Sequence, residues 1–117
     1  MTALADQTLQ ACNKNSSPLS ENGIGEYLKE LTEWELIIDR NINQISKTYT
    51  FNNFKSAQSF SVEIGNIAEA ENHHPRICIE WGKVSVCWWT HVVSGLFIND
   101  FIMAARCDKA YEALASE

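Results

Sequence analysis

Hydrophobic positions along the chain follow two different periods, and this predicts a mixture of helices and strands. Apolar residues recur three and four positions apart in residues 20–33, about 53–69 and about 98–115, which is typical of helices. Apolar and polar residues alternate in four shorter stretches, which are residues 34–39, 44–51, 76–81 and 83–91. The predicted order is therefore helix, two strands, helix, two strands, helix.

The spacing of these elements predicts the fold class. Strands that follow each other after short turns favour antiparallel pairing, and helices that cover one face of a sheet form a two-layer domain. We therefore predict an α+β fold in which a four-stranded antiparallel sheet carries three helices on one face, in the order α-β-β-α-β-β-α. Residues 1–20 are polar and follow neither period, so we expect a mobile N-terminal tail before a domain of residues 21–117.

The sequence WGKV predicts how the last two strands pair. A two-residue turn at Gly82-Lys83, with glycine first, is a common hairpin turn. It places Trp81 opposite Val84 and, further along, Cys78 opposite Cys87. Free thiols are the expected state of these two cysteines, because thiols pack readily inside a sheet.

All three histidines of the chain lie between residues 71 and 91. In the predicted register His74 lies opposite His91, where opposed Cβ atoms are about 4.5–5.5 Å apart, and His73 lies on the adjoining turn. A cluster of histidines indicates proton transfer or metal binding, although ordinary core or surface histidines are an alternative. We expect no metal, because adjacent residues on an extended segment point to opposite sides.

Composition narrows the classes of function. The chain has 117 residues, a net charge of −6 and only nine Lys and Arg, which argues against a nucleic-acid surface. It has no apolar run of about 18 residues that would predict a membrane span, and no basic and apolar leader that would predict secretion. The four cysteines form no C-x-x-C pair, so we expect free thiols and a cytoplasmic protein.

The last predicted helix has two apolar sides. Phe101, Ala104 and Tyr111 lie on one side. The other side has a pattern typical of a helix–helix seam, formed by Met103, Cys107, Ala110 and Leu114. We expect a homo-oligomer in which this seam contacts a second subunit; the alternative is that both sides enter one core.

Several short motifs resemble those of the pterin-4a-carbinolamine dehydratases, especially the bacterial branch associated with phenylalanine hydroxylase. They are ENHHP, EWGKV, WWTH and NDFIMAAR, and the resemblance covers about residues 19–114. It implies a four-stranded antiparallel sheet with helices on one side. It also implies an enzyme that dehydrates 4a-hydroxytetrahydropterin to the quinonoid dihydropterin, without a cofactor. The alternative is a binding, coactivator or regulatory protein on the same fold.

The resemblance also implies roles for individual residues. The expected catalytic residues are His73, His74 and His91, with His74 and His91 as the first choices for the acid and the base. The expected substrate-binding residues are Glu69, Asn72, Trp89 and Asp100. Some relatives carry Asp where this chain has Asn72, which affects how the pterin ring is held. The implied partners are a pterin substrate, further copies of the chain and, through a functional link, phenylalanine hydroxylase.

Overall fold

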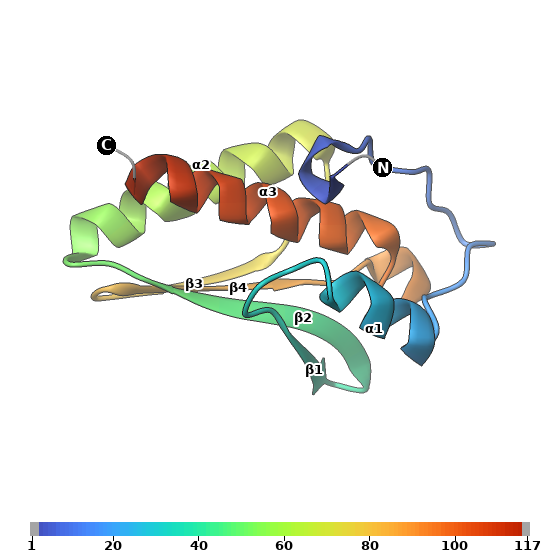
Figure 1. The fold of residues 1–117 in the computed structure, drawn as a ribbon. Helices are drawn as coiled ribbons and strands as arrows, with labels where there is room; N and C mark the ends of the chain where they lie inside the picture. The colour runs from blue at the N-terminus through green and yellow to red at the C-terminus, as the bar shows by residue number, and fades with distance from the viewer. Residues whose placement is uncertain (1–2, 116–117) are drawn as a thin grey trace.

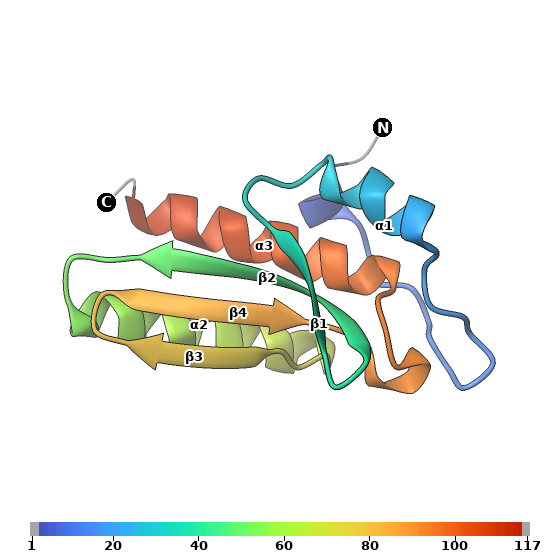
Figure 2. The same ribbon diagram turned by 90° about the horizontal axis from the view of Figure 1, so that it is seen from below.

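The computed structural model describes residues 3–115, which form one four-stranded antiparallel sheet and three α-helices. The elements are η1 (Leu4–Asp6), α1 (Glu21–Leu28), β1 (Glu35–Asp39), β2 (Ile42–Thr50), α2 (Phe54–Glu71), β3 (Arg76–Glu80), β4 (Lys83–Trp88), η2 (His91–Val93) and α3 (Ile98–Ala115). The strand order across the sheet is β1-β2-β4-β3. The α2 and α3 helices lie over one face of the sheet (Figure 1), and the view from below shows α2 behind β3 and β4 (Figure 2). The predicted α+β fold and the element order are confirmed.

The hydrophobic core lies between the two central strands and the helices. Side chains at alternate positions of β2 and β4 face the helices because successive residues of a strand point to opposite faces. From the helical side α2 contributes Ala57, Phe60 and Ile64, each with no exposed surface. The strands contribute Ile45, Tyr49, Val84, Val86 and Trp88. This alternation is the pattern from which the strands were predicted.

A partly buried carboxylate, that of Asp108, links β2 to α3. Asp108 accepts hydrogen bonds from the Tyr49 hydroxyl at 2.6 Å, Lys47 Nζ at 2.9 Å and Trp34 Nε1 at 3.1 Å. Burial, followed by the neighbouring Cys107 and Asp108, raises the pKa of Tyr49 above its ordinary value. The phenol therefore stays protonated and continues to donate to the carboxylate. The cluster fixes the position of the middle of α3 on the sheet.

Both apolar sides of α3 enter the core of a single chain, so the predicted intersubunit seam is wrong. Met103 and Cys107, expected on the seam, have no exposed surface, as do Phe101 and Ala104 on the expected core side. The reason is that α3 is surrounded: it contacts η1, α2, β4 and α1. Among the residues expected on the seam, Leu114 is the one with an exposed side chain, at 37%. No helix within residues 3–115 has the length and apolar character needed to cross a membrane.

The β3–β4 hairpin turns one residue earlier than expected. Glu80 pairs with Lys83, so Trp81 and Gly82 form the turn and Cys78 lies opposite Ser85 rather than Cys87. Gly82 has φ +74°, and a positive φ at the second central residue is the requirement of a type II turn. A Cβ atom on Gly82 would lie 3.0 Å from the Phe51 carbonyl oxygen, so the position also needs glycine for space. The predicted register is wrong by two residues.

The N-terminal segment, residues 3–12, lies along α3, which differs from the mobile tail expected for residues 1–20. Leu4 is buried at 4% exposure. Arg106 of α3 donates to the carbonyl oxygens of Ala5 at 3.2 Å and Gln7 at 2.7 Å. The segment therefore has defined contacts with the domain, and residues 1 and 2 lie outside the described part of the chain.

Candidate active site

The α2 helix ends at a left-handed residue that turns the chain toward the sheet. Asn72 has φ 51° and ψ 41°, a conformation that asparagine adopts more easily than most residues. Its backbone N–H donates to the Glu69 carbonyl at 3.2 Å, and the N–H of His73 donates to the Ala68 carbonyl at 3.1 Å. These bonds satisfy carbonyl groups at the end of the helix. They also place His73 beside the end of β4 and the start of α3.

The imidazole of His73 is held on one edge and one face. Its Nε2 atom lies 2.7 Å from Asp100 Oδ1, and its ring stacks on Trp88 with a centroid separation of 5.5 Å and an interplanar angle of 17°. The side chain is 14% exposed, whereas the Asp100 side chain has no exposed surface. A histidine whose Nε2 faces a carboxylate has a defined orientation, and the second nitrogen remains available for another partner.

Asp100 organises the start of α3 as well as His73. Its Oδ2 atom accepts hydrogen bonds from the Thr90 hydroxyl at 2.8 Å and from the backbone N–H of Phe97 at 2.9 Å. The second bond reaches back to the residue before the helix, as the acidic residue of a capping box does, and an acidic group is favourable at a helix N-terminus. The buried carboxylate of Asp100 therefore joins the segment after α2, the segment after β4 and the start of α3.

His74 and His91 are the solvent-facing histidines of the cluster. His74 is 53% exposed, and its Nε2 lies 3.6 Å from Glu69 Oε1, which is too long for a good hydrogen bond. His91 begins η2, which is separated by two residues from the end of β4, and its ring centroid lies 5.0 Å from that of Trp89. Both imidazoles are therefore accessible to a ligand in a way that His73 is not.

The three histidines line one cavity of about 440 Å³. In the observed hairpin register His74 does not lie opposite His91. The η2 turn nevertheless brings His91 to the cavity that His73 and His74 line. Thr90 and Gly95 exchange backbone hydrogen bonds of 2.8 and 3.4 Å, which close the loop that contains η2. The remaining lining residues are Leu9, Gln10, Cys12, Glu71, Asn72, Thr90, Val92 and Asn99.

Of the seven site residues expected from the sequence, four line this cavity: the three histidines and Asn72. Asp100, Glu69 and Trp89 are not part of it; each instead contacts or approaches one histidine. Four of the lining residues that were missed directly adjoin predicted site residues in the sequence, so a wider window would have found them: Glu71, Thr90, Val92 and Asn99. Leu9, Gln10 and Cys12 gave no signal, because they lie in the segment expected to be a mobile tail.

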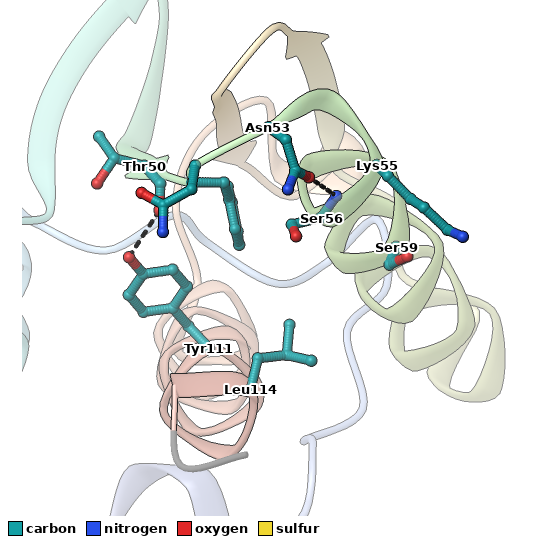
Figure 3. Close-up of a pocket in the computed structure, with 9 residues that line it drawn as sticks. Thr50, Asn53, Lys55, Ser56, Ser59, Tyr111 and Leu114 are labelled. Atoms are coloured by element: carbon teal, nitrogen blue, oxygen red, sulfur yellow. Dashed lines mark hydrogen bonds between the residues drawn. The ribbon is translucent and has the colours of Figure 1, made fainter.

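A larger cavity, of about 710 Å³, lies at the opposite end of the sheet, where β2 leads into α2 (Figure 3). Two of its polar side chains are hydrogen-bonded to other residues of the lining: the Asn53 side chain accepts from the Ser56 N–H at 2.8 Å, and the Tyr111 hydroxyl donates to the Thr50 carbonyl at 2.8 Å. Its lining contains neither histidine nor carboxylate. The smaller cavity is therefore the candidate active site, since it contains the groups suited to proton transfer.

Residues 3–115 contain no group of three or more His, Cys, Asp and Glu side chains placed to hold a metal ion. At the histidine cluster, one edge of His73 is already occupied by Asp100. A catalytic zinc site normally needs three protein ligands. The expectation of acid–base chemistry without a metal therefore stays a prediction for this cavity.

Comparison with known proteins shows a consistent likeness. The family model described as "Pterin 4 alpha carbinolamine dehydratase" matches residues 17–110. A protein of Chlorobium luteolum named "Putative pterin-4-alpha-carbinolamine dehydratase" is 44% identical over 89% of this chain and 91% of its own length. A protein of the same name from Marinobacter nauticus is 42% identical over 95% of this chain and 100% of its own.

The same likeness extends to a solved structure. The crystal structure of a "transcriptional coactivator/pterin dehydratase" from Brucella melitensis superposes with a TM-score of 0.73 at 26% identity. The superposition covers 80% of this chain and 98% of the other. The fold and the matched family thus agree.

Proposed function

Because the chain belongs to the pterin-4-alpha-carbinolamine dehydratase family, we propose that its histidine cavity dehydrates a 4a-hydroxytetrahydropterin by general acid–base catalysis. The observation that carries this proposal is the convergence of His73, His74 and His91 on one cavity, with His73 fixed by a buried carboxylate. The product is the quinonoid dihydropterin, and the pterin is the substrate, so the reaction needs no separate cofactor.

The reaction requires two proton transfers. A general acid protonates the hydroxyl group on C4a, the C–O bond breaks and water leaves. A general base removes the proton from N5, and the electron pair of the N–H bond completes a double bond between N5 and C4a. Imidazoles suit both steps because histidine ordinarily exchanges protons near neutral pH.

The exposure of the histidines supports a division of labour. His74 and His91 are accessible, so we assign the acid and the base to this pair. His73 is stacked on Trp88 and bonded to Asp100, so we assign it the task of orienting the pterin, with Asp100 as a positioning residue that acts through it. Asn72 lines the cavity and is suited to hydrogen bonding with the ring.

Two of the residues expected to bind substrate are better placed to act through histidines. Glu69 lies beside His74, and the ring of Trp89 lies beside that of His91. We propose that each restricts the orientation of its neighbouring imidazole. Orientation of an acid or a base contributes to catalysis because proton transfer needs hydrogen-bond distances.

The deciding experiment is a coupled assay in which a phenylalanine hydroxylase generates the 4a-hydroxytetrahydropterin, and the decay of its absorbance is followed with and without this protein. We expect acceleration by the wild type. His74→Ala and His91→Ala should each reduce kcat by about tenfold or more, a conservative share of the acid–base contribution. Lys55→Ala, in the larger cavity, serves as a control and should retain the wild-type rate.

No acceleration by the wild-type protein would refute the proposal. Wild-type rates in both histidine variants would refute the acid–base assignment while leaving the activity in place. The two results are separable because the first concerns the reaction and the second concerns the residues.

The Brucella melitensis neighbour is also named as a transcriptional coactivator, so a binding role is the alternative to catalysis. The complete histidine cluster favours catalysis, since binding alone does not require three imidazoles in one cavity. We further propose a functional link to phenylalanine hydroxylation, because hydroxylation of that kind supplies the substrate that the resemblance implies. A cytoplasmic location suits that link.

Association into a homo-oligomer also stays a prediction, but without the α3 seam. Light scattering at micromolar concentration should give at least twice the 13.2 kDa of one chain. A monomer mass would contradict it.

A further inference from the structure

We propose that Leu9, Gln10 and Cys12 of the N-terminal segment form a substrate-binding wall of the histidine cavity, an inference that rests on the proposed dehydration. Leu9, Gln10 and Cys12 line the same cavity as the three histidines. The region that matches the family model begins only at residue 17. The cavity of this chain is therefore completed by residues that precede the matched domain.

Asn99 fixes this wall to the same helical turn that holds His73. Its side-chain oxygen accepts from the Gln10 N–H at 2.7 Å, and its side-chain nitrogen donates to the Gln10 carbonyl at 2.8 Å. Asn99 is buried at 6% exposure, which makes these bonds hard to exchange for water. The next residue is Asp100. The first turn of α3 thus sets the position of the wall and of the His73 imidazole together.

Arg106, two turns further along α3, provides a second attachment. Besides its bonds to the Ala5 and Gln7 carbonyls, its Nη1 lies 3.2 Å from Glu71 Oε2. Glu71 is the last residue of α2 and also lines the cavity. One guanidinium group therefore connects the segment, α3 and the end of α2, so the wall is held through both α3 and α2.

The chemistry of the wall predicts which kinetic constant it affects. Leu9, Gln10 and Cys12 bear neither a carboxylate nor an imidazole, so the wall provides contact area and shape rather than the acid or the base. We expect these contacts to stabilise the ground state and the transition state equally, and the loss of such uniform binding raises KM with kcat unchanged. The wall is thus a determinant of pterin binding and not of proton transfer.

The test compares two neighbouring substitutions that introduce the same side chain. Cys12 is partly buried and lines the cavity, whereas Ala11 is exposed and does not. In the coupled assay Cys12→Phe should raise KM by about fivefold or more and change kcat by less than about twofold, because it narrows the binding space alone. Ala11→Phe should keep both constants at the wild-type values.

A variant that lacks residues 2–12 tests the opposite change, removal of the wall. It should also raise KM by about fivefold or more, while the pH profile of kcat keeps its wild-type shape because the histidines are unchanged. If the deletion prevents folding, which circular dichroism would reveal, the Phe pair decides alone.

The outcomes separate this inference from the proposed function. Wild-type KM in Cys12→Phe, or a fall in kcat without a change in KM, would overturn the wall while leaving the dehydratase intact. A wild-type protein that does not accelerate the reaction would overturn the proposed function, and the wall with it.

Discussion

Replacing Asp100 by asparagine tests whether the buried carboxylate controls the chemistry of His73. Asparagine has nearly the same shape but one acceptor oxygen in place of two. If that oxygen keeps the bonds from the Thr90 hydroxyl and the Phe97 N–H, the amide N–H₂ faces His73 Nε2. An amide can only donate there, so the imidazole must present an unprotonated Nε2. The substitution thus reverses the polarity of one 2.7 Å hydrogen bond.

The size of the effect follows from the kind of bond that is lost. A hydrogen bond to a charged group contributes about 1.5–3 kcal/mol net. Since about 1.4 kcal/mol in the barrier corresponds to a factor of ten in rate, kcat should fall by about tenfold to 150-fold if His73 must be held by an acceptor in the transition state. The free energy of unfolding should fall as well, because the carboxylate has no exposed surface.

Asp108→Asn is the matched control for this experiment. Asp108 lies on the same helix and, like Asp100, has three hydrogen-bond partners, but it is not part of the histidine cavity. We expect urea unfolding to show a loss of stability in both variants and the coupled assay to show a loss of kcat in Asp100→Asn alone. Equal kcat in Asp100→Asn and the wild type, or equal losses in the two variants, would refute the role given to the carboxylate.

Three further predictions concern the hairpin, the buried thiol and metals. Gly82→Ala should cost about 1–2 kcal/mol of stability because of its positive φ and the nearby Phe51 carbonyl, with kcat unchanged; an unaltered urea midpoint would contradict this. Burial raises the pKa of Cys107 to about 12, so at pH 8 its thiol should stay protonated and resist Ellman's reagent until unfolding, whereas exposed Cys78 should react at once. Rapid labelling of Cys107 in the folded protein would show that the thiol is not shielded. Treatment with a strong chelator should leave activity unchanged, and a loss that only zinc restores would show that a metal takes part.

The element order could be predicted from the sequence because it depends on which side chains are buried. Alternation in β2 and β4 and the helical stripe of α2 reflect contact with one shared core. The hairpin register could not be predicted in the same way. WGKV allows either Gly82-Lys83 or Trp81-Gly82 as the central residues of the turn. Glycine occupies the first central position in one turn and the second in the other, and both positions can require glycine. Burial patterns do not distinguish these registers, because a shift of two residues keeps every side chain on the same face.

The α3 helix shows a different limit of periodicity. Two apolar sides indicated two contacts, and the pattern was right about both: Met103 and Cys107 are buried, as Phe101 and Ala104 are. The pattern did not say whether the second contact comes from another chain or from the same one. That depends on where the N-terminal segment and α2 lie, which is a property of the whole fold.

The histidine cluster was found from the sequence, but its wall was not, and the reason is the chemistry of the attachment. Residues 3–12 are held largely through main-chain groups: Asn99 bonds both backbone atoms of Gln10, and Arg106 bonds the carbonyls of Ala5 and Gln7. Every non-proline residue carries the same backbone donor and acceptor, so such contacts impose no pattern on the segment itself. In the sequence these contacts are reflected on α3 alone, where Asn99 is a buried amide and Arg106 is a partly buried cation. A segment with no period of its own can therefore be a fixed part of an active site when side chains elsewhere supply its hydrogen bonds.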